Sequence, residues 1–154
     1  MAHRLLVLQE MAHRVGTWER INRAIRERLR VRLKRDPQPS AGVVDSQSVK
    51  TSGVGGEERG YDGAKKVKGR KRHLLVDTEG FVLEAKVHSA EVMDYEGIKA
   101  LLGRAKGLFP RLSHLWMDGG YTGEDKGAGW VEKTFSGGAW RSSADRASLL
   151  LRKY

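Results

Sequence analysis

The sequence predicts an α/β domain in which three strands are followed by a helix and a fourth strand. Two observations carry this prediction. Short apolar runs alternate with clusters of turn residues, and a longer run between the last two of them has helical periodicity. A helix in that place is the usual connection between strands of one sheet. The length of 154 residues suits one domain with its own core.

A basic helix over residues 17–36 precedes the predicted domain. Its apolar side chains recur every three or four residues along one face, at Trp18, Ile21, Ile25, Leu29 and Leu33. Thr17 is expected to cap the first turn. Pro37 is expected to end the helix, because the residue before a proline avoids the helical conformation. Arginines fill the other faces, so the helix is either a solvated surface element or one that faces a nucleic acid.

The first three strands of the domain are expected at residues 41–45, 73–76 and 81–87. The first is a short apolar run that ends on a carboxylate, Asp45. The other two form a hairpin, because the turn residues 77–80 between them end in Gly80, which can adopt a positive φ. Residues 51–70 are rich in glycine and charge, and we expect no element longer than a turn there.

A helix and a fourth strand complete the predicted domain. Asp94 is expected to cap the helix and Pro110 to end it. The buried stripe of this helix comprises Ile98, Leu101, Leu102, Ala105 and either Leu108 or Phe109. The fourth strand covers residues 112–117 and, like the first, ends on a carboxylate, Asp118.

The net charge of +10 favours a polyanionic partner, because each phosphate that a cation neutralises releases counterions. Fourteen of the 29 Lys and Arg side chains lie in two windows, residues 18–35 and 65–73. The second window holds six cations and no acid, which favours nucleic acid as the partner and leaves a solvated loop as the alternative. No apolar run is long enough to span a membrane, so we expect a cytoplasmic protein.

Two of the predicted strands end on an aspartate, Asp45 and Asp118, although strands disfavour this residue type. If the two strands are neighbours in the sheet, the carboxylates can hold a divalent cation between them, as metal-assisted attack at phosphorus requires. The chain has no cysteine, so oxygen or imidazole must hold any metal, and Mg²⁺ is the natural candidate. A role in capping loops is the alternative for both aspartates.

Three separated sequence boxes add to this pattern. Residues 45–51 read Asp-Ser-Gln-Ser-Val-Lys-Thr, residues 60–77 run from Gly-Tyr-Asp-Gly through the second basic window to Leu-Leu-Val-Asp, and residues 118–123 read Asp-Gly-Gly-Tyr-Thr-Gly. In order and spacing these boxes resemble the transposases of bacterial insertion sequences that have a DDE catalytic triad. The resemblance is to the group with an Asp-Ser-Gln-Ser-Val-Lys box around the first acid, and it covers about residues 17–130.

This resemblance implies a ribonuclease H-like domain that cleaves DNA and transfers strands with Mg²⁺ or Mn²⁺. Asp45 and Asp118 match the first two catalytic acids and would bind the metal, whereas Asp77 falls in the hairpin turn and is interpreted as structural. The family's basic box, which would face DNA, corresponds to Lys65, Lys66, Lys68, Arg70, Lys71 and Arg72. The expected partners are the ends of the element and its target DNA, with a second copy of the chain or a full-length transposase as further candidates.

The third acid departs from the family pattern. The family places a Glu on a helix several dozen residues after the second Asp, in a box that resembles Trp-Val-Val-Glu-Arg-Thr-Phe. Here residues 130–135 read Trp-Val-Glu-Lys-Thr-Phe, and Glu132 follows Asp118 by 14 residues, too few for a strand, a connection and a helical turn. Three interpretations stay open. The catalytic Glu has been lost and Glu132 is a look-alike, Glu132 reaches the metal from an irregular segment, or a deletion has fused the box to the exit of the fourth strand.

These observations divide the chain into a segment outside the resemblance, the basic helix, a partial catalytic domain and a tail, at residues 1–16, 17–36, 41–130 and 136–154. The tail mixes arginine, serine, alanine and leucine without a period, as a shifted reading frame would. We therefore expect a domain truncated at both ends, without the fifth strand and the closing helix of the family. An inactive DNA-binding remnant is one alternative, and a chain too incomplete to fold stably is another.

Four further polar side chains are given structural roles. His73 and His88 are expected to pack or to hydrogen-bond rather than to bind a metal, because carboxylates already supply the ligands that a hard cation prefers. Tyr121 and Thr122 follow Asp118 and are expected in a turn, with substrate positioning as the alternative.

Overall fold

The computed structural model describes residues 16–51, 59–117, 121, 129–131, 133 and 141–143. The chain divides into two compact units, Met1–Pro37 and Gln38–Tyr154. Their boundary lies within the proline-containing stretch that follows the basic helix.

Helix α2, Thr17–Arg32, is the described element of the first unit. Gly16 rather than Thr17 occupies the N-cap position, with φ 93°, a conformation that glycine adopts without strain. The carbonyl of Gly16 accepts the N–H of Arg20 at 3.0 Å and so begins the helix. Of the five apolar positions expected on one face, four are exposed, namely Trp18, Ile21, Ile25 and Leu33.

Helix α2 ends at Arg32, before the expected limit at residue 36, and Pro37 does not end it. Lys34 adopts a left-handed conformation with φ 56°. The N–H of Arg35 then donates to the carbonyl of Arg30 at 2.9 Å, which is the bond of a Schellman motif. This closure satisfies carbonyl groups of the last turn before the proline is reached.

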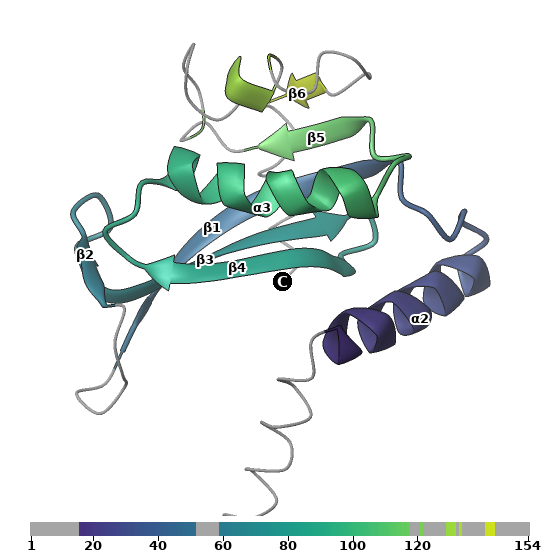
Figure 1. The fold of residues 1–154 in the computed structure, drawn as a ribbon, viewed down its shortest axis with the longest axis horizontal. Coiled ribbons are helices and arrows are strands. Elements are labelled where there is room, and N and C mark those ends of the chain that lie inside the picture. Colours follow the sequence, from purple (N-terminus) through teal and green to yellow (C-terminus); the bar gives the residue numbers. More distant parts are fainter. Residues whose placement is uncertain are drawn as a thin grey trace, which may run out of the picture. The chain divides into compact units, whose positions relative to one another are not determined.

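The second unit is built on a mixed sheet with helix α3 along one face (Figure 1). Its elements are β1 Ala41–Lys50, β2 Gly60–Asp62, β3 Val67–Asp77, β4 Val82–Ser89, α3 Asp94–Leu108, β5 His114–Met117 and β6 Arg141–Ser143. Strands β1, β3 and β4 are antiparallel neighbours, β5 runs parallel to β1, and β6 runs parallel to β5. Gly69 of β3 pairs with Lys50 of β1 on one side and with Gly60 of β2 on the other. β2 and β4 therefore both lie on the side of β3 opposite to β1.

The α/β class is confirmed, while the predicted end of the first strand and the predicted start of the second are wrong. β1 continues past Asp45 to Lys50, because its whole length pairs with β3. β3 begins at Val67 rather than at residue 73, so most of the second basic window is a strand and not a loop. β6 lies inside the tail that we expected to be irregular, so at least three residues of that tail form a strand beside β5. A three-residue edge strand needs only backbone hydrogen bonds, and its polar sequence therefore shows no pattern.

The hairpin between β3 and β4 forms as predicted. Gly80 adopts φ 86° in its turn. Asp77 is buried, and its Oδ1 accepts the N–H groups of Glu79 and Phe81 at 2.9 Å each. The carboxylate of Asp77 is the acceptor for two backbone N–H groups of the turn, which agrees with the structural role given to Asp77.

Helix α3 covers the core with the stripe that its periodicity predicts. Its buried hydrophobic residues are Ile98, Leu101, Leu102 and Ala105. Phe109 rather than Leu108 completes the stripe, since Phe109 is buried and Leu108 is exposed. They pack with Val44, Leu75, Leu83, Leu112, Leu115, Met117, Tyr121 and Val131. The N-cap residue is Met93, so Asp94 is the first residue of the helix and not its cap.

Candidate active site

Asp45 lies in the middle of β1, not at the strand end that the sequence indicated. It is half-buried and pairs with Leu74 of β3. Val44 belongs to the core under α3, and Ser46 hydrogen-bonds to the first residue of α3. Because neighbouring side chains of a strand point to opposite sides, Asp45 lies on the other side of the sheet. We call the two sides the helix face and the Asp45 face.

The last described residue of β5 is Met117, which pairs with Val44. Asp118 is the next residue in the sequence, but it lies outside the described residues, as does Glu132. Of the three expected catalytic acids, Asp45 is thus the one that the structure describes. Within the described ranges, no group of three or more His, Asp or Glu side chains lies close enough to hold a metal ion.

Three of the expected DNA contacts lie on the Asp45 face, at Lys68, Arg70 and Arg72. They alternate along β3 with residues of the helix face and lead up to Leu74, the partner of Asp45. Lys68 and Arg72 are exposed, and Arg70 is half-buried. Arg72 donates from its guanidinium to the side-chain oxygen of its cross-strand neighbour Gln47. A row of cations therefore extends along the sheet from Asp45.

Two more expected contacts, Lys65 and Lys66, are exposed in the turn between β2 and β3. Lys66 adopts a left-handed conformation with φ 54°. The ammonium of Lys65 donates to the backbone carbonyl of Ser46 at 3.0 Å and to its hydroxyl at 3.2 Å. Lys65 thus contacts the residue that directly follows Asp45.

The sixth expected DNA contact, Lys71, is not on the surface. Its side chain points to the helix face and is buried. Its ammonium lies 2.9 Å from Oδ1 of Asp94 and 3.3 Å from Oδ2 of Asp62, and it donates to the carbonyl of Val92 at 2.9 Å. The ammonium is thus ion-paired with two carboxylates and hydrogen-bonded to a backbone carbonyl inside the fold. The prediction that Lys71 contacts DNA does not fit this buried position, because alternation along β3 turns Lys71 away from its cationic neighbours.

The two carboxylates at Lys71 also hold β1. The hydroxyl of Ser46 donates to Oδ2 of Asp94 at 3.0 Å, and that of Ser48 donates to Oδ2 of Asp62 at 2.5 Å. Asp62 additionally accepts the N–H groups of Ala64 and Lys65 at 3.1 Å each and so shapes the turn before β3. One buried ion cluster therefore joins β1, β2, β3 and the start of α3.

Both carboxylates of this cluster stay ionised in the fold. Burial raises the pKa of Asp62, but the hydroxyl of Ser48, the N–H of Lys65 and the charge of Lys71 outweigh it and bring the pKa to about 2. Burial likewise raises the pKa of Asp94, yet Lys71 and the hydroxyl of Ser46 leave it below its ordinary value. The cluster is thus a lysine held between two negative charges.

Two histidines lie beside this cluster on the helix face. The rings of His73 and His88 stack with their centroids 4.9 Å apart. Nδ1 of His73 lies 3.3 Å from the hydroxyl of Tyr121, which is itself buried, and Nδ1 of His88 lies 2.8 Å from the carbonyl of Ser89. Burial, followed by the charge of His88, lowers the pKa of His73 to about 4. These contacts agree with the packing and hydrogen-bonding roles expected of both histidines.

Sequence reasoning missed Asp62 and took Asp94 for a helix cap. The available signal was polar residues spaced by two in each of two segments. Ser46 and Ser48 follow the first acid, and Lys71 comes two residues before His73. Polar side chains on the buried face of a sheet require hydrogen-bond partners, and a buried lysine requires a partner of opposite charge. The partners themselves come from distant parts of the chain, which spacing alone does not reveal.

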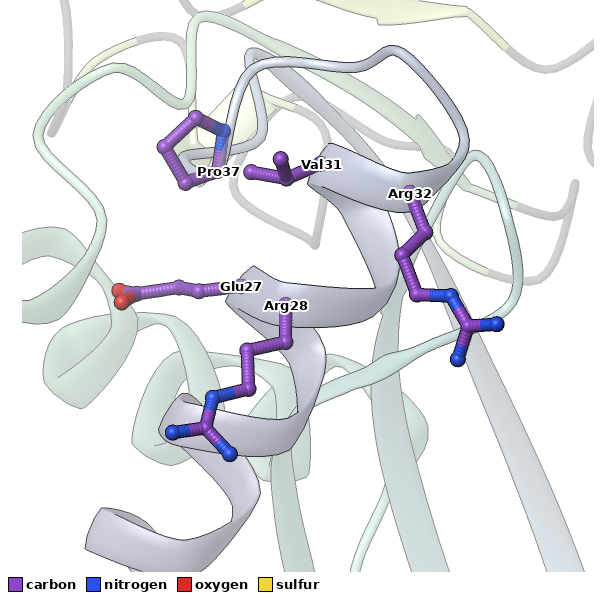
Figure 2. Close-up of a pocket in the computed structure, with 5 residues that line it drawn as sticks. All are labelled: Glu27, Arg28, Val31, Arg32 and Pro37. Carbon is purple, nitrogen blue, oxygen red and sulfur yellow. The ribbon is translucent and has the colours of Figure 1, made fainter.

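The first unit contains a shallow hollow of about 480 Å³ on α2, lined by Glu27, Arg28, Val31, Arg32 and Pro37 (Figure 2). The side chains of Arg28 and Arg32 extend away from Pro37 in this view. Glu27 already pairs with Arg23 at 2.9 Å. None of the acids expected to hold a metal lines this hollow.

In the part of the chain that the structure describes, no helix is long and apolar enough to cross a membrane.

The second unit is an α/β sheet with an acid and a row of cations on one face, a combination suited to a polyanion and a divalent cation. The sequence profile of the transposase DDE domain matches residues 36–140, more than half of the chain, so the chain belongs to this family. The match begins after α2 and extends beyond residue 130, where we expected it to end. Neither a curated protein nor a solved structure matches the chain.

Proposed function

We propose that the chain is the transposase of a bacterial insertion sequence and acts on DNA by metal-dependent cleavage and strand transfer. The observation that carries this proposal is the parallel pairing of β1 with β5 inside the family match. Val44 pairs with Met117, and in the sequence each of these two residues is followed by an aspartate, Asp45 and Asp118. Consecutive Cα atoms lie about 3.8 Å apart, so each acid directly follows one member of a paired position.

The strand order supports the ribonuclease H-like arrangement that we propose for the domain. Three antiparallel strands lead into α3, and β5 returns parallel to the central strand β1. β6 adds a second parallel strand beyond β5. Asp45 lies on the central strand of this arrangement, and Asp118 follows the last residue of β5 in the sequence.

We propose Asp45 and Asp118 as ligands of Mg²⁺ or Mn²⁺. Their carboxylate oxygens are the donors that both cations prefer. The described part of the site fits such an ion, because Asp45 is half-buried on a strand paired on both sides, which fixes its backbone. A cation held there would supply activation of the attacking hydroxyl and charge stabilisation of the departing oxygen. The part of the two aspartates is to hold the ion at one place on the Asp45 face.

For DNA we propose contacts by the cations of the same face and the adjoining turn, Lys65, Lys66, Lys68, Arg70 and Arg72. Phosphate contacts of this kind position the duplex without reading its sequence. The row of cations along β3 would place a phosphodiester near Asp45. The ends of the element and its target are the partners we propose, and a second transposase chain would bring two ends together.

The third acid decides between two forms of this function. With Glu132 or another acid at the metal, the chain cleaves DNA. Without one, the exposed cations Lys68 and Arg72 still bind DNA, and the chain is an inactive DNA-binding remnant. The cations favour DNA binding in either form, because phosphate contacts do not depend on the metal.

Nicking of supercoiled plasmid by the full chain in Mg²⁺ or Mn²⁺ tests the proposal. We expect nicking by the unmutated chain and a loss of about 100-fold or more in Asp45→Asn and in Asp118→Asn, since each removes a metal ligand. Glu96→Gln is the matched control, because Glu96 is an exposed acid on α3. No nicking together with salt-sensitive DNA binding would identify the inactive remnant. Equal nicking by Asp45→Asn would contradict the assignment of the acids.

A further inference from the structure

A buried lysine in the middle of a basic box requires an explanation, because a buried ammonium is stable only when it is paired. Lys71 has its partners in Asp62, Asp94 and the carbonyl of Val92, at 3.3, 2.9 and 2.9 Å. A DNA phosphate would have to displace at least one of these oxygens from a site on the helix face. Lys71 therefore has a different task from Arg72, which directly follows it and is exposed.

The partners of Lys71 lead to the strand that carries Asp45. Asp94 accepts the hydroxyl of Ser46 at 3.0 Å, and Asp62 accepts the hydroxyl of Ser48 at 2.5 Å. Both serines are thus hydrogen-bonded to carboxylates that one ammonium holds in place. Ser46 has a second contact, because the ammonium of Lys65 donates to the backbone carbonyl of Ser46 at 3.0 Å.

Because of the strand geometry, the hydrogen bonds of Ser46 and Ser48 also constrain the residues on the opposite face. Side chains alternate along β1, so fixing Ser46 and Ser48 toward α3 fixes Asp45 and Gln47 toward the other side. Ser46 is joined to Asp45 by one planar peptide bond. Fixing the hydroxyl of Ser46 therefore restricts the orientation of the Asp45 carboxylate. The ion cluster therefore lies directly behind the acid.

We propose that Lys71, together with Asp62 and Asp94, is a positioning group that sets Asp45 for the divalent cation. The inference rests on the proposed function, since it assumes that Asp45 binds a metal. It assigns Lys71 to the support of the acid and leaves the phosphate contacts to the exposed cations of β3. Partners behind a metal ligand of this kind typically change metal affinity by about 10- to 100-fold when they are removed.

Mn²⁺ binding to the full chain, measured by electron paramagnetic resonance, tests this inference without relying on activity. Asp45→Asn should abolish binding at the site, which tests the metal site itself. Lys71→Met should weaken Mn²⁺ binding about 10-fold, whereas Lys106→Met, at an exposed lysine in the last turn of α3, should leave it unchanged. If Asp45→Asn binds Mn²⁺ as the unmutated chain does, the metal assignment of the proposed function fails. If Asp45→Asn loses binding and Lys71→Met keeps it, only the positioning role fails.

Two gentler variants keep the test decisive if Lys71→Met does not fold. Ser46→Ala removes one hydroxyl from the surface of the cluster, and Ser46→Thr restores it on a residue that suits a strand. We expect Ser46→Ala to weaken Mn²⁺ binding several-fold and Ser46→Thr to bind like the unmutated chain. Equal affinities of Ser46→Ala and the unmutated chain would overturn the proposal.

DNA affinity as a function of salt separates positioning from phosphate contact. In metal-free buffer, Arg72→Met should lower affinity and reduce the slope of log affinity against log salt by about one. Lys71→Met should change neither, because its ammonium does not reach the Asp45 face. A reduced slope for Lys71→Met would show that it contacts phosphate and would overturn the proposal.

Discussion

The two faces of strand β3 use the same kind of residue for opposite purposes. On the Asp45 face, Lys68 and Arg72 are exposed. On the helix face, Lys71 is buried between two carboxylates. The difference follows from the alternation of the strand and from the cost of burying a charge without a partner. A run of cations in the sequence is therefore not the same as a cationic surface in the fold.

The largest expected difference between the two faces is in stability. Lys71→Met leaves Asp62 and Asp94 without their shared cation, and we expect it to lower the free energy of unfolding by about 3–5 kcal/mol. Arg72→Met removes an exposed side chain and should change the free energy of unfolding by about 0.5 kcal/mol or less. Urea unfolding at neutral pH measures both. Similar losses in the two variants would contradict the division of β3 into an internal and an external face.

Acid should destabilise the helix face through His73. Its pKa is 6.5 in the unfolded chain and about 4 in the fold, so the unfolded chain takes up the proton first. The stabilisation is complete above pH 6.5 and decreases as the pH falls to about 4, by about 3 kcal/mol in all. Below pH 4 the depressed pKa of Asp62, about 2, adds a further loss of stability in the same direction.

Urea unfolding between pH 7 and pH 4 measures this dependence. His73→Gln should flatten it, because the substituted side chain does not titrate. His114→Gln is the matched control, since His114 lies at a register position of the Asp45 face, and it should keep the dependence. An unchanged pH dependence in His73→Gln would exclude His73 as its source.

The glycines of α3 provide a smaller and local test. A Cβ on Gly97 would lie 2.2 Å from Nε2 of His73 and 2.6 Å from Nε2 of His88, whereas a Cβ on Gly103 would meet nothing within 4 Å. Gly97→Ala should therefore cost about 1–3 kcal/mol because the stacked histidines have to move. Gly103→Ala should stabilise the chain by about 0.5–1 kcal/mol through helix propensity. Thermal unfolding compares the two, and a stabilising Gly97→Ala would show that α3 does not pack closely on the histidines.

The sequence predicted those elements whose buried positions are apolar. The stripe of α3 and the hairpin turn at Gly80 were found because periodicity and turn chemistry are local. The start of β3 was missed because its buried positions there are Gly69, Lys71 and His73, none of which marks a strand interior. Helix α2 was found, but its end was misplaced because a lysine rather than a glycine adopts the left-handed closing conformation.

For the candidate site, the sequence identified Asp45 but not its support. Asp45 follows an apolar run, which is a local signal, and the family match includes it. The pairing of Lys71 with Asp62 and Asp94 joins residues that are far apart in the sequence, and only the sheet and α3 bring them together. Spacing alone assigned Lys71 to DNA because a run of charges does not reveal on which face each side chain lies.

Lysine labelling by acetylation, read by mass spectrometry with and without duplex DNA, tests the central distinction between the two faces most directly. We predict that Lys66 and Lys68 react in the free protein and are protected by DNA, and that Lys71 reacts in neither state. Labelling of Lys71 in the free protein that DNA suppresses would contradict the account, because it would place this lysine on the DNA-binding surface.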